Sequence, residues 1–310
     1  MNNRTLFGGR DTRLAGHRRA DARPTSRGQI APRIWLPLLA LLLILSGCGA
    51  KPAERAASAP ADTGQAAGVD GAAAAEPAAS EPVTLTVSAA ASLTDALGEL
   101  ERAYEAEHPY VKLDFNFGAS GALQRQIEQG APADLFLSAS SPNMQALLDG
   151  GLIDAVYETD WLTNTLVAVV PTDSTVAKIE DLRRADVKTI AIGMPDSVPA
   201  GKYAQEALAH AGLWEPLQGK LVQGKDVRQV LQYAETGNAD AGFVYKTDAL
   251  TSNRVKIAFD VDPAGYSPIR YPIGVVKATG HAGAARDFYA YLQTPEALKL
   301  LSRYGFSAAQ

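Results

Sequence analysis

The chain has 310 residues, of which 46% are hydrophobic, and its 34 acidic and 29 basic side chains give a formal charge of −5. This balance argues against a nucleic-acid-binding protein, which needs a basic face. The single cysteine excludes an internal disulfide and a cysteine-rich metal site.

The first 47 residues have the features of a secretory signal peptide. Residues 1–33 hold eight Arg and no Lys, and residues 34–45 form an apolar run broken only by one proline. Twelve residues are too few to span a bilayer, which takes about 20, but they suit the apolar region of a signal. The run ends in Leu45-Ser46-Gly47-Cys48, which resembles a lipobox. We therefore expect cleavage before Cys48 and a lipid anchor on that cysteine.

The next segment, residues 48–82, has the composition of a tether. Residues 50–82 contain 14 Ala and 4 Pro among 33 residues, with no aromatic side chain. Such a sequence buries too little apolar surface to offset its conformational entropy, so we predict a disordered tether between the anchor and a folded domain. Cleavage would leave 21 Lys and Arg against 32 Asp and Glu, a charge of −11. An anion site on such a chain must depend on local dipoles.

From residue 83 the chain alternates between strand and helix patterns. Strands are predicted at residues 83–87, 111–117, 134–138, 166–170, 189–193, 242–245, 255–259 and 273–276. Helices are predicted from Leu93 to the stop at His108-Pro109, through residues 123–127, from Pro142, from Ala200, from Val227, at 284–292 and at 295–304. This order predicts an α/β fold with mostly parallel sheets, in which ligands bind where strands end and helices begin.

Four of the strand-to-helix junctions have chemistry suited to an anion. Ser92 and Ser120 each follow a predicted strand, and two further helices begin near Ala200 and Val227. A helix start offers unpaired backbone N–H groups and the positive end of the helix dipole, which together bind anions without a charged side chain. Any one junction taken alone is better explained as an ordinary helix cap. Their recurrence predicts a binding site.

Seven motifs between residues 83 and 310 carry a resemblance to a known family. They are Ala89-Ala-Ala-Ser92-Leu-Thr-Asp-Ala96, Gly118-Ala-Ser120, Gly130-Ala-Pro-Ala-Asp-Leu-Phe-Leu-Ser-Ala139, Val198-Pro-Ala-Gly-Lys-Tyr-Ala204, Asp226-Val-Arg228, Gly242-Phe-Val-Tyr245 and Arg303-Tyr-Gly-Phe306. In these motifs the chain resembles the periplasmic molybdate-binding proteins of ABC importers. It departs from common members at Gly118-Ala119-Ser120-Gly121, where a run of serines is frequent.

The resemblance implies a two-lobed periplasmic-binding-protein fold with a ligand cleft between the lobes. Lobe 1 would comprise residues 83–163 and 247–310, and lobe 2 residues 164–246. The residues implied to bind the oxyanion are Ser92, Ser120 and Tyr245 through their hydroxyls and Ala200 and Val227 through their backbone N–H groups. The protein would capture molybdate or tungstate in the periplasm and pass it to the permease of an ABC importer. We expect a monomer that is not an enzyme and needs no cofactor, with no side chain as a direct ligand to a metal cation.

The donor chemistry of such a site is selective among oxyanions. Neutral donors suit a dianion without a proton, whereas a protonated phosphate would leave its own O–H unpaired at a cost of about 1–3 kcal/mol. Molybdate, tungstate or sulfate is therefore favoured over phosphate. We expect Lys202 and Arg228 to face solvent or pair with acidic neighbours. Asp134 and Asp226 should have structural roles, Asp226 as a helix cap.

Other classes of function remain open at this point. A binding protein for another oxyanion such as sulfate has the same requirements. A serine hydrolase would use Ser120 with His210 or His281 as the base, although the sequence around Ser120 is not G-x-S-x-G. An iron(III)-binding protein would use Tyr266 and Tyr271 but would leave the serine junctions unexplained.

Overall fold

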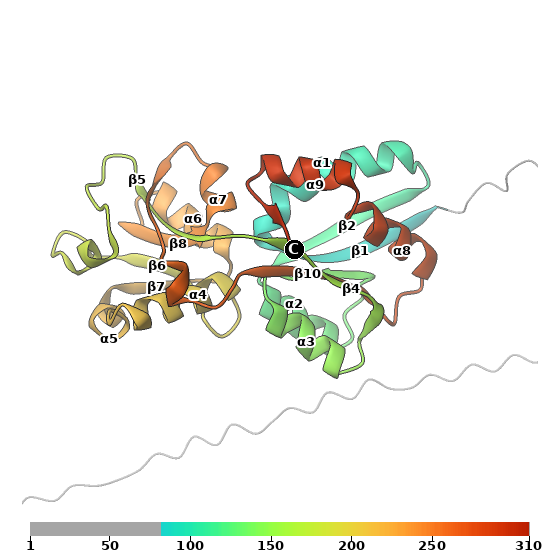
Figure 1. Cartoon of the computed structure of the whole chain (residues 1–310), viewed down its shortest axis with the longest axis horizontal. Coiled ribbons are helices and arrows are strands. Elements are labelled where there is room, and N and C mark those ends of the chain that lie inside the picture. Colours follow the sequence, from blue (N-terminus) through green and yellow to red (C-terminus); the bar gives the residue numbers. More distant parts are fainter. Residues whose placement is uncertain (1–81, 310) are drawn as a thin grey trace, which may run out of the picture. The chain divides into compact units, whose positions relative to one another are not determined.

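Two β-sheets organise the part of the chain that the structure, a computed structural model, describes, namely residues 82–309 (Figure 1). All of these residues fall within one compact unit of the chain. The first sheet has the strand order β11-β4-β10-β3-β1-β2 and the second β7-β6-β8-β5-β9. The predicted signal peptide, Cys48 and the predicted tether up to residue 81 lie outside the described residues.

The elements around the first sheet form lobe 1. Its strands are β1 (Val83–Ala90), β2 (Val111–Gly118), β3 (Leu135–Leu137), β4 (Ile153–Thr163), β10 (Arg270–Val276) and β11 (Ser307–Ala308). Its helices are η1 (Ala91–Leu93), α1 (Thr94–Glu107), α2 (Ser120–Glu128), α3 (Ser141–Asp149), α8 (Ala282–Tyr291) and α9 (Pro295–Arg303).

The elements around the second sheet form lobe 2. Its strands are β5 (Leu166–Pro171), β6 (Ile190–Gly193), β7 (Leu221–Gly224), β8 (Ala241–Tyr245) and β9 (Val255–Asp260). Its helices are η2 (Ile179–Arg183), α4 (Pro199–His210), α5 (Trp214–Leu217), η3 (Gln218–Lys220), α6 (Val227–Glu235), α7 (Lys246–Leu250) and η4 (Pro263–Gly265). No helix within residues 82–309 is both long and apolar enough to cross a membrane.

Both sheets are mixed, so the prediction of mostly parallel sheets is wrong. β1 pairs in parallel with β2 and β3, but β10 is antiparallel to both β3 and β4. In lobe 2, β6 is parallel to β7 and β8, whereas β5 is antiparallel to β8 and β9. The parallel strands are joined through helices, as parallel pairing requires. Apart from the two-residue β11, which is antiparallel to β4, the strands that introduce antiparallel pairing are β4, β5, β9 and β10, next to the two places where the chain passes between the lobes.

The predicted end of lobe 2 at residue 246 is also wrong. Strand β9 follows that residue, yet it pairs with β5 in the second sheet, and α7 packs against β5, β8 and β9. The chain returns to the first sheet only at β10. The two crossings between the lobes therefore lie between Thr163 and Leu166 and between Asp260 and Arg270.

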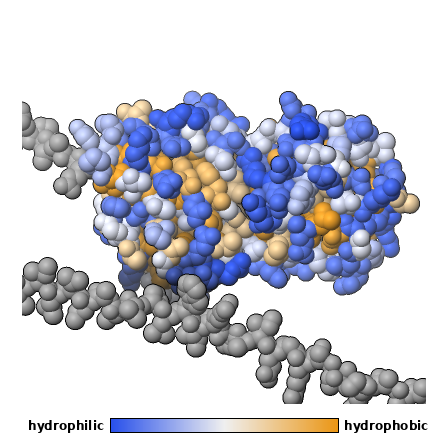
Figure 2. Space-filling model, turned by 180° about the vertical axis from the view of Figure 1, so that it is seen from behind, coloured by the Kyte–Doolittle hydropathy of each residue, from blue (hydrophilic) through white to orange (hydrophobic). Residues whose placement is uncertain are grey.

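The core of each lobe follows from the burial of its central strands. All five residues of β8 are buried, as are the first five of β5, because helices cover both faces of the sheet. Lobe 1 packs α1 and α8 around the fully buried Tyr104 and Phe288, whose rings meet edge to face at 4.9 Å. Figure 2 shows that hydrophilic residues cover most of one face of the molecule.

Candidate functional site

One small cavity between the lobes brings together all five residues predicted to bind an oxyanion. Ser92 and Ser120 line it from lobe 1, and Ala200, Val227 and Tyr245 line it from lobe 2. Its volume is about 10 Å³, whereas pockets for drug-sized ligands measure about 300–1,000 Å³. The closed site therefore excludes a sugar or a peptide. A larger hollow of about 400 Å³ on lobe 2 contains none of the five residues.

Parallel strand pairing places the two serines side by side. Strands β1 and β2 are adjacent and in register, so that Ala90 lies opposite Gly118 at their carboxyl ends. Ser92 follows in η1, and Ser120 is the first residue of α2. Because both strands are followed by helices at the same edge of the sheet, both serines line the same cavity.

The same arrangement recurs in lobe 2. Strands β6 and β7 are parallel with Gly193 opposite Gly224, and each precedes a helix. Helix α4 begins at Pro199, and α6 begins at Val227 with Asp226 as its cap, as expected from the sequence. The carboxylate of Asp226 accepts a hydrogen bond from the N–H of Gln229 at 2.8 Å. The positive ends of both helices therefore meet at the cavity.

Glycines allow the start of α4 to approach β6 closely. A Cβ atom on Gly201 would lie 2.0 Å from the carbonyl oxygen of Gly193, a separation that no side chain tolerates. This close approach explains why the fourth position of the motif Val198-Pro-Ala-Gly is a glycine. Since Ala200 is the second residue of α4, its N–H has no acceptor within the helix.

The three hydroxyls at the cavity differ in their partners. Ser120 Oγ accepts a hydrogen bond from the N–H of Ala139 at 2.9 Å, and Ser92 Oγ lies 2.9 Å from the hydroxyl of Tyr271. The hydroxyl of Tyr245 is buried and has no hydrogen-bond partner among residues 82–309. Burial raises the pKa of Tyr245 well above its ordinary value, so this hydroxyl stays protonated. A buried donor without a partner costs about 1–3 kcal/mol, which indicates a ligand.

No charged side chain lines the cavity in the described part of the chain. Arg228, at the start of α6, pairs with the fully buried Asp248 of α7 at 2.8 Å and with Asp95 of α1 at 2.5 Å. Lys202 is exposed. The expectation that these two cations pair with acids or face solvent is confirmed. Asp134 has the structural role expected of it, because its carboxylate accepts the N–H of Thr86 at 2.7 Å.

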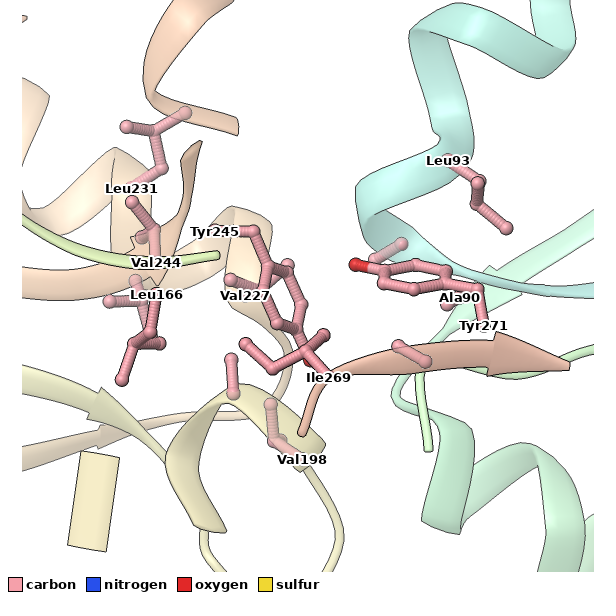
Figure 3. Packing of buried hydrophobic residues seen from close by; sticks show 14 of the residues in the cluster. Ala90, Leu93, Leu166, Val198, Val227, Leu231, Val244, Tyr245, Ile269 and Tyr271 are labelled. Atoms are coloured by element: carbon pink, nitrogen blue, oxygen red, sulfur yellow. The ribbon is translucent and has the colours of Figure 1, made fainter. Parts of the chain in front are cut away.

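The lobes touch each other around the cavity. The N–H of Gly121 in α2 donates to the carbonyl oxygen of Ser197, which precedes α4, at 3.0 Å. The ion pair between Arg228 and Asp95 also joins the two lobes. Figure 3 shows buried side chains of the two lobes facing each other here, with Val198, Val227 and Tyr245 on the lobe 2 side and Ala90 and Tyr271 on the lobe 1 side. The structure is therefore in a closed arrangement.

The histidines and tyrosines of the competing interpretations are engaged elsewhere. His281 lies 3.4 Å from Asp134, and His210 packs beside Gly265; within residues 82–309 neither histidine hydrogen-bonds Ser120. The hydroxyl of Tyr266 accepts the N–H of Leu166. The described residues contain no group of three or more His, Cys, Asp or Glu that could hold a metal ion. Within residues 82–309 the geometry thus places neither histidine as a general base for Ser120.

Two residues next to the site were not predicted from the sequence as part of it. Asn164 lies in the first crossing, and Tyr271, considered only as an iron ligand, follows the second crossing. Their side chains are hydrogen-bonded to each other and, through Tyr271, to Ser92. More than 100 residues separate Asn164 from Tyr271 in the chain, so no local pattern connects them.

The chain matches known proteins along nearly all of its described part. The model of the family described as bacterial extracellular solute-binding protein matches residues 85–307. A protein of Bacillus subtilis (strain 168) named "putative ABC transporter substrate-binding lipoprotein" is 50% identical over 228 residues, which is 73% of this chain and 87% of that protein. The molybdate-binding protein of Haemophilus influenzae is 40% identical over 230 residues, 72% of this chain and 90% of that protein.

The solved structures show the same architecture. The periplasmic molybdate-binding protein of Azotobacter vinelandii superposes with a TM-score of 0.67 at 24% identity, over 73% of this chain and 100% of that chain. At this level of identity the likeness concerns the fold alone. The predicted two-lobed periplasmic-binding-protein fold is confirmed, with mixed sheets in place of mostly parallel ones.

Proposed function

The chain belongs to the family of bacterial extracellular solute-binding proteins, and from this premise we propose that it captures molybdate between its lobes for an ABC-type importer. The observation that carries the proposal is the convergence of hydroxyls and helix starts from both lobes on one cavity without a charged side chain. Relatives that bear the name molybdate-binding protein support the choice of ligand. The permease of the importer would be its partner.

The proposed ligand contacts are those predicted from the sequence. Ser92 and Ser120 would donate their hydroxyl protons from lobe 1. The N–H groups of Ala200 and Val227 and the hydroxyl of Tyr245 would donate from lobe 2. A site with contacts on both lobes favours the closed arrangement when the ion is bound, because only that arrangement supplies every donor. Tungstate, which has the same charge and a tetrahedral shape, would bind as well.

Further parts of the proposal concern the protein as a whole. Membership of an extracellular family places it outside the cytoplasm, and we propose that a lipid on Cys48 anchors it to a membrane at the periplasm. It would work as a monomer. It would hold its ligand without changing it, needing neither a cofactor nor a catalytic residue.

Removal of either serine hydroxyl should weaken binding. We expect Ser92→Ala and Ser120→Ala each to cost about 1–2 kcal/mol of molybdate binding free energy, since each removes one hydrogen bond to a dianion. Isothermal titration calorimetry would show this as a fall in affinity of about 5- to 30-fold. Ser302→Ala, on the exposed face of α9, is the matched control and should bind as the wild type does. Wild-type affinity in both site variants would contradict the site.

A panel of oxyanions tests the ligand itself. Molybdate and tungstate should raise the melting temperature of the wild type, because a ligand at 100 times its Kd stabilises the folded state by about 2.7 kcal/mol. Sulfate, chromate and phosphate complete the panel in a thermal-shift assay. Stabilisation by sulfate alone would replace molybdate with sulfate as the ligand. Stabilisation by none of these ions would overturn the proposal.

A further inference from the structure

A chain of hydrogen bonds connects the first crossing between the lobes to Ser92. The N–H of Thr165 donates to Asn164 Oδ1 at 2.9 Å. Asn164 Nδ2 donates to the hydroxyl oxygens of Thr247 at 2.9 Å and of Tyr271 at 3.3 Å. The hydroxyl of Tyr271 lies 2.9 Å from Ser92 Oγ. Tyr271 is completely buried, and Ser92 and Thr247 are nearly so.

The order of donors along this chain follows from its first member. A backbone N–H can only donate, so Thr165 requires the oxygen of the Asn164 amide on its side and places the amide nitrogen toward Tyr271. The phenol oxygen of Tyr271 therefore accepts. Its proton needs an acceptor, and we assign this role to Ser92 Oγ, 2.9 Å away, since the neighbouring hydroxyl of Tyr245 makes no hydrogen bond within residues 82–309. Burial raises the pKa of Tyr271 well above its ordinary value, so this proton is present at neutral pH.

We propose that Asn164 and Tyr271 are positioning residues that hold the Ser92 hydroxyl as a donor toward the cavity and so restrict the site to unprotonated oxyanions. Ser92 Oγ accepts from Tyr271, and its own proton is left for the ligand. The inference rests on the proposed function, since it names the selectivity of that same site. It adds two residues that do not line the cavity and act only through Ser92.

The other two hydroxyls are able to donate for separate reasons. Ser120 Oγ already accepts the N–H of Ala139, and Tyr245 keeps its proton because it is buried. Ser92 thus differs from Ser120. The direction of the Ser92 hydroxyl depends on hydrogen bonds from other side chains and not on a backbone N–H. If Ser92 were free to rotate, its oxygen would accept the O–H of a protonated oxyanion such as hydrogen phosphate. Fixing its direction removes that acceptor from the lobe 1 side of the cavity, and leaves the Tyr245 hydroxyl as the one of the three without a fixed partner within residues 82–309.

Two variants test this chain at different points. Tyr271→Phe removes the hydroxyl that donates to Ser92 and frees Ser92 to turn. Asn164→Asp keeps the size of the side chain but places an acceptor oxygen toward Tyr271. The Tyr271 proton would then turn to the aspartate, Ser92 would donate to Tyr271, and a lone pair of Ser92 would face the ligand. The matched control is Tyr104→Phe, which removes a hydroxyl that is equally buried in lobe 1 and has no hydrogen-bond partner in the described part of the chain.

The measurement is the pair of calorimetric affinities for molybdate and for inorganic phosphate at pH 8, where phosphate retains one proton. We expect Tyr271→Phe to weaken molybdate binding by about 3- to 10-fold, the effect of one hydrogen bond, and to narrow the preference for molybdate over phosphate by tenfold or more. Asn164→Asp should lose more molybdate affinity than Tyr271→Phe. Tyr104→Phe should keep both affinities.

The outcomes separate this inference from the proposed function. If Tyr271→Phe and Asn164→Asp keep the wild-type preference for molybdate over phosphate, the inference is overturned and the proposed function is not. An equal loss of affinity for both anions in these variants would also overturn it, because a merely structural role predicts that result. A wild type that binds no oxyanion would overturn the proposed function and the inference with it. If sulfate proved to be the ligand, the same comparison with sulfate in place of molybdate would decide the inference.

Discussion

Replacing Gly121 by alanine is expected to weaken molybdate binding by about 30- to 150-fold without destabilising the unliganded protein. A Cβ atom at this position would lie 2.9 Å from the carbonyl oxygen of Ser197 and 3.0 Å from its Cα. Both atoms belong to the backbone of the opposite lobe, which a side-chain rotation cannot relieve. An added methyl group in a packed contact costs about 2–3 kcal/mol. This energy corresponds to a loss of affinity of about 30- to 150-fold.

The penalty falls only on the closed arrangement. Once the lobes separate, Ser197 moves away from α2 and the methyl group meets solvent. Alanine is also a better helix former than glycine by up to about 1 kcal/mol, and Gly121 is the second residue of α2. The substitution should therefore leave the melting temperature of the unliganded protein unchanged or slightly higher while it lowers affinity.

Calorimetry with small-angle scattering would check this prediction. Wild-type protein should contract when molybdate is added, and Gly121→Ala should contract less at the same ligand concentration. The matched control is Gly98→Ala on α1, where a Cβ atom meets nothing within 4 Å; it should bind as the wild type does. Wild-type affinity in Gly121→Ala would show that the contact between α2 and Ser197 is not part of the liganded state.

The lobe 1 half of the candidate site could be predicted from the sequence because it depends on local order. Two alternating strands, each followed by a serine and a helix, place Ser92 and Ser120 at one sheet edge once the strands pair in parallel. The start of α6 at Val227 was also predictable, because Asp226 is a typical helix cap. For Ala200, Val227 and Tyr245 as a set, the resemblance to a family supplied what local pattern could not.

Strand β4 escaped prediction for a physical reason. A half-buried strand is found by its alternation of apolar and polar residues, and residues 153–163 show no regular alternation of burial. Their pairing with β10 contains two register shifts, between Tyr271 and Pro272 and between Gly274 and Val276. Each shift changes which residues face the core, so the period of two is lost.

The end of lobe 2 was misplaced because nothing in the sequence of β9 says which sheet it joins. Residues 255–259 were predicted as a strand, and a strand of that pattern fits either sheet. Its partner β5 lies some 90 residues earlier in the chain. The hydrogen bonds that connect Thr165, Asn164, Tyr271 and Ser92 could not be predicted for the same reason. They form only after both crossings have brought distant segments of the polypeptide together.

The second large effect is expected at Arg228, whose replacement by methionine should destabilise the protein by about 1–2 kcal/mol at pH 8. Asp248 is completely buried, and Arg228 Nε lies 2.8 Å from its Oδ1. Without Arg228 this carboxyl loses the charge that compensates it and takes up a proton instead, since its pKa is already about 7 with the guanidinium present. Each pH unit above that value then costs about 1.4 kcal/mol relative to the wild type. Methionine keeps much of the length of the arginine stem, so the loss reports mainly on charge. Chemical denaturation at pH 8 would measure it.

Two further variants separate the buried pair from the contact between the lobes. Arg228 also reaches Asp95 on lobe 1, but the side chain of Asp95 is 45% exposed, and such pairs contribute about 0–1 kcal/mol. Asp95→Asn should therefore cost at most about 1 kcal/mol. The double variant Arg228→Met with Asp248→Asn should recover most of the loss, because it no longer buries a charge. A double variant as unstable as Arg228→Met alone would contradict the role of Asp248.

The pH dependence of these variants follows from the titration of Asp248. Burial raises its pKa from 3.8 to about 7, although the Arg228 guanidinium lowers it. Because the folded-state pKa lies above the unfolded one, the folded state binds more protons between about pH 4 and pH 7, so this group's contribution to stability falls as pH rises through that window. Without the guanidinium the pKa of Asp248 rises further, and the pH range over which stability falls extends upward.

Arg228→Met should thus lose more stability relative to wild type at pH 8 than at pH 6. The added Asp248→Asn change should abolish this difference between the two pH values. An equal loss at both pH values would mean that Arg228 stabilises the fold through packing rather than by neutralising Asp248.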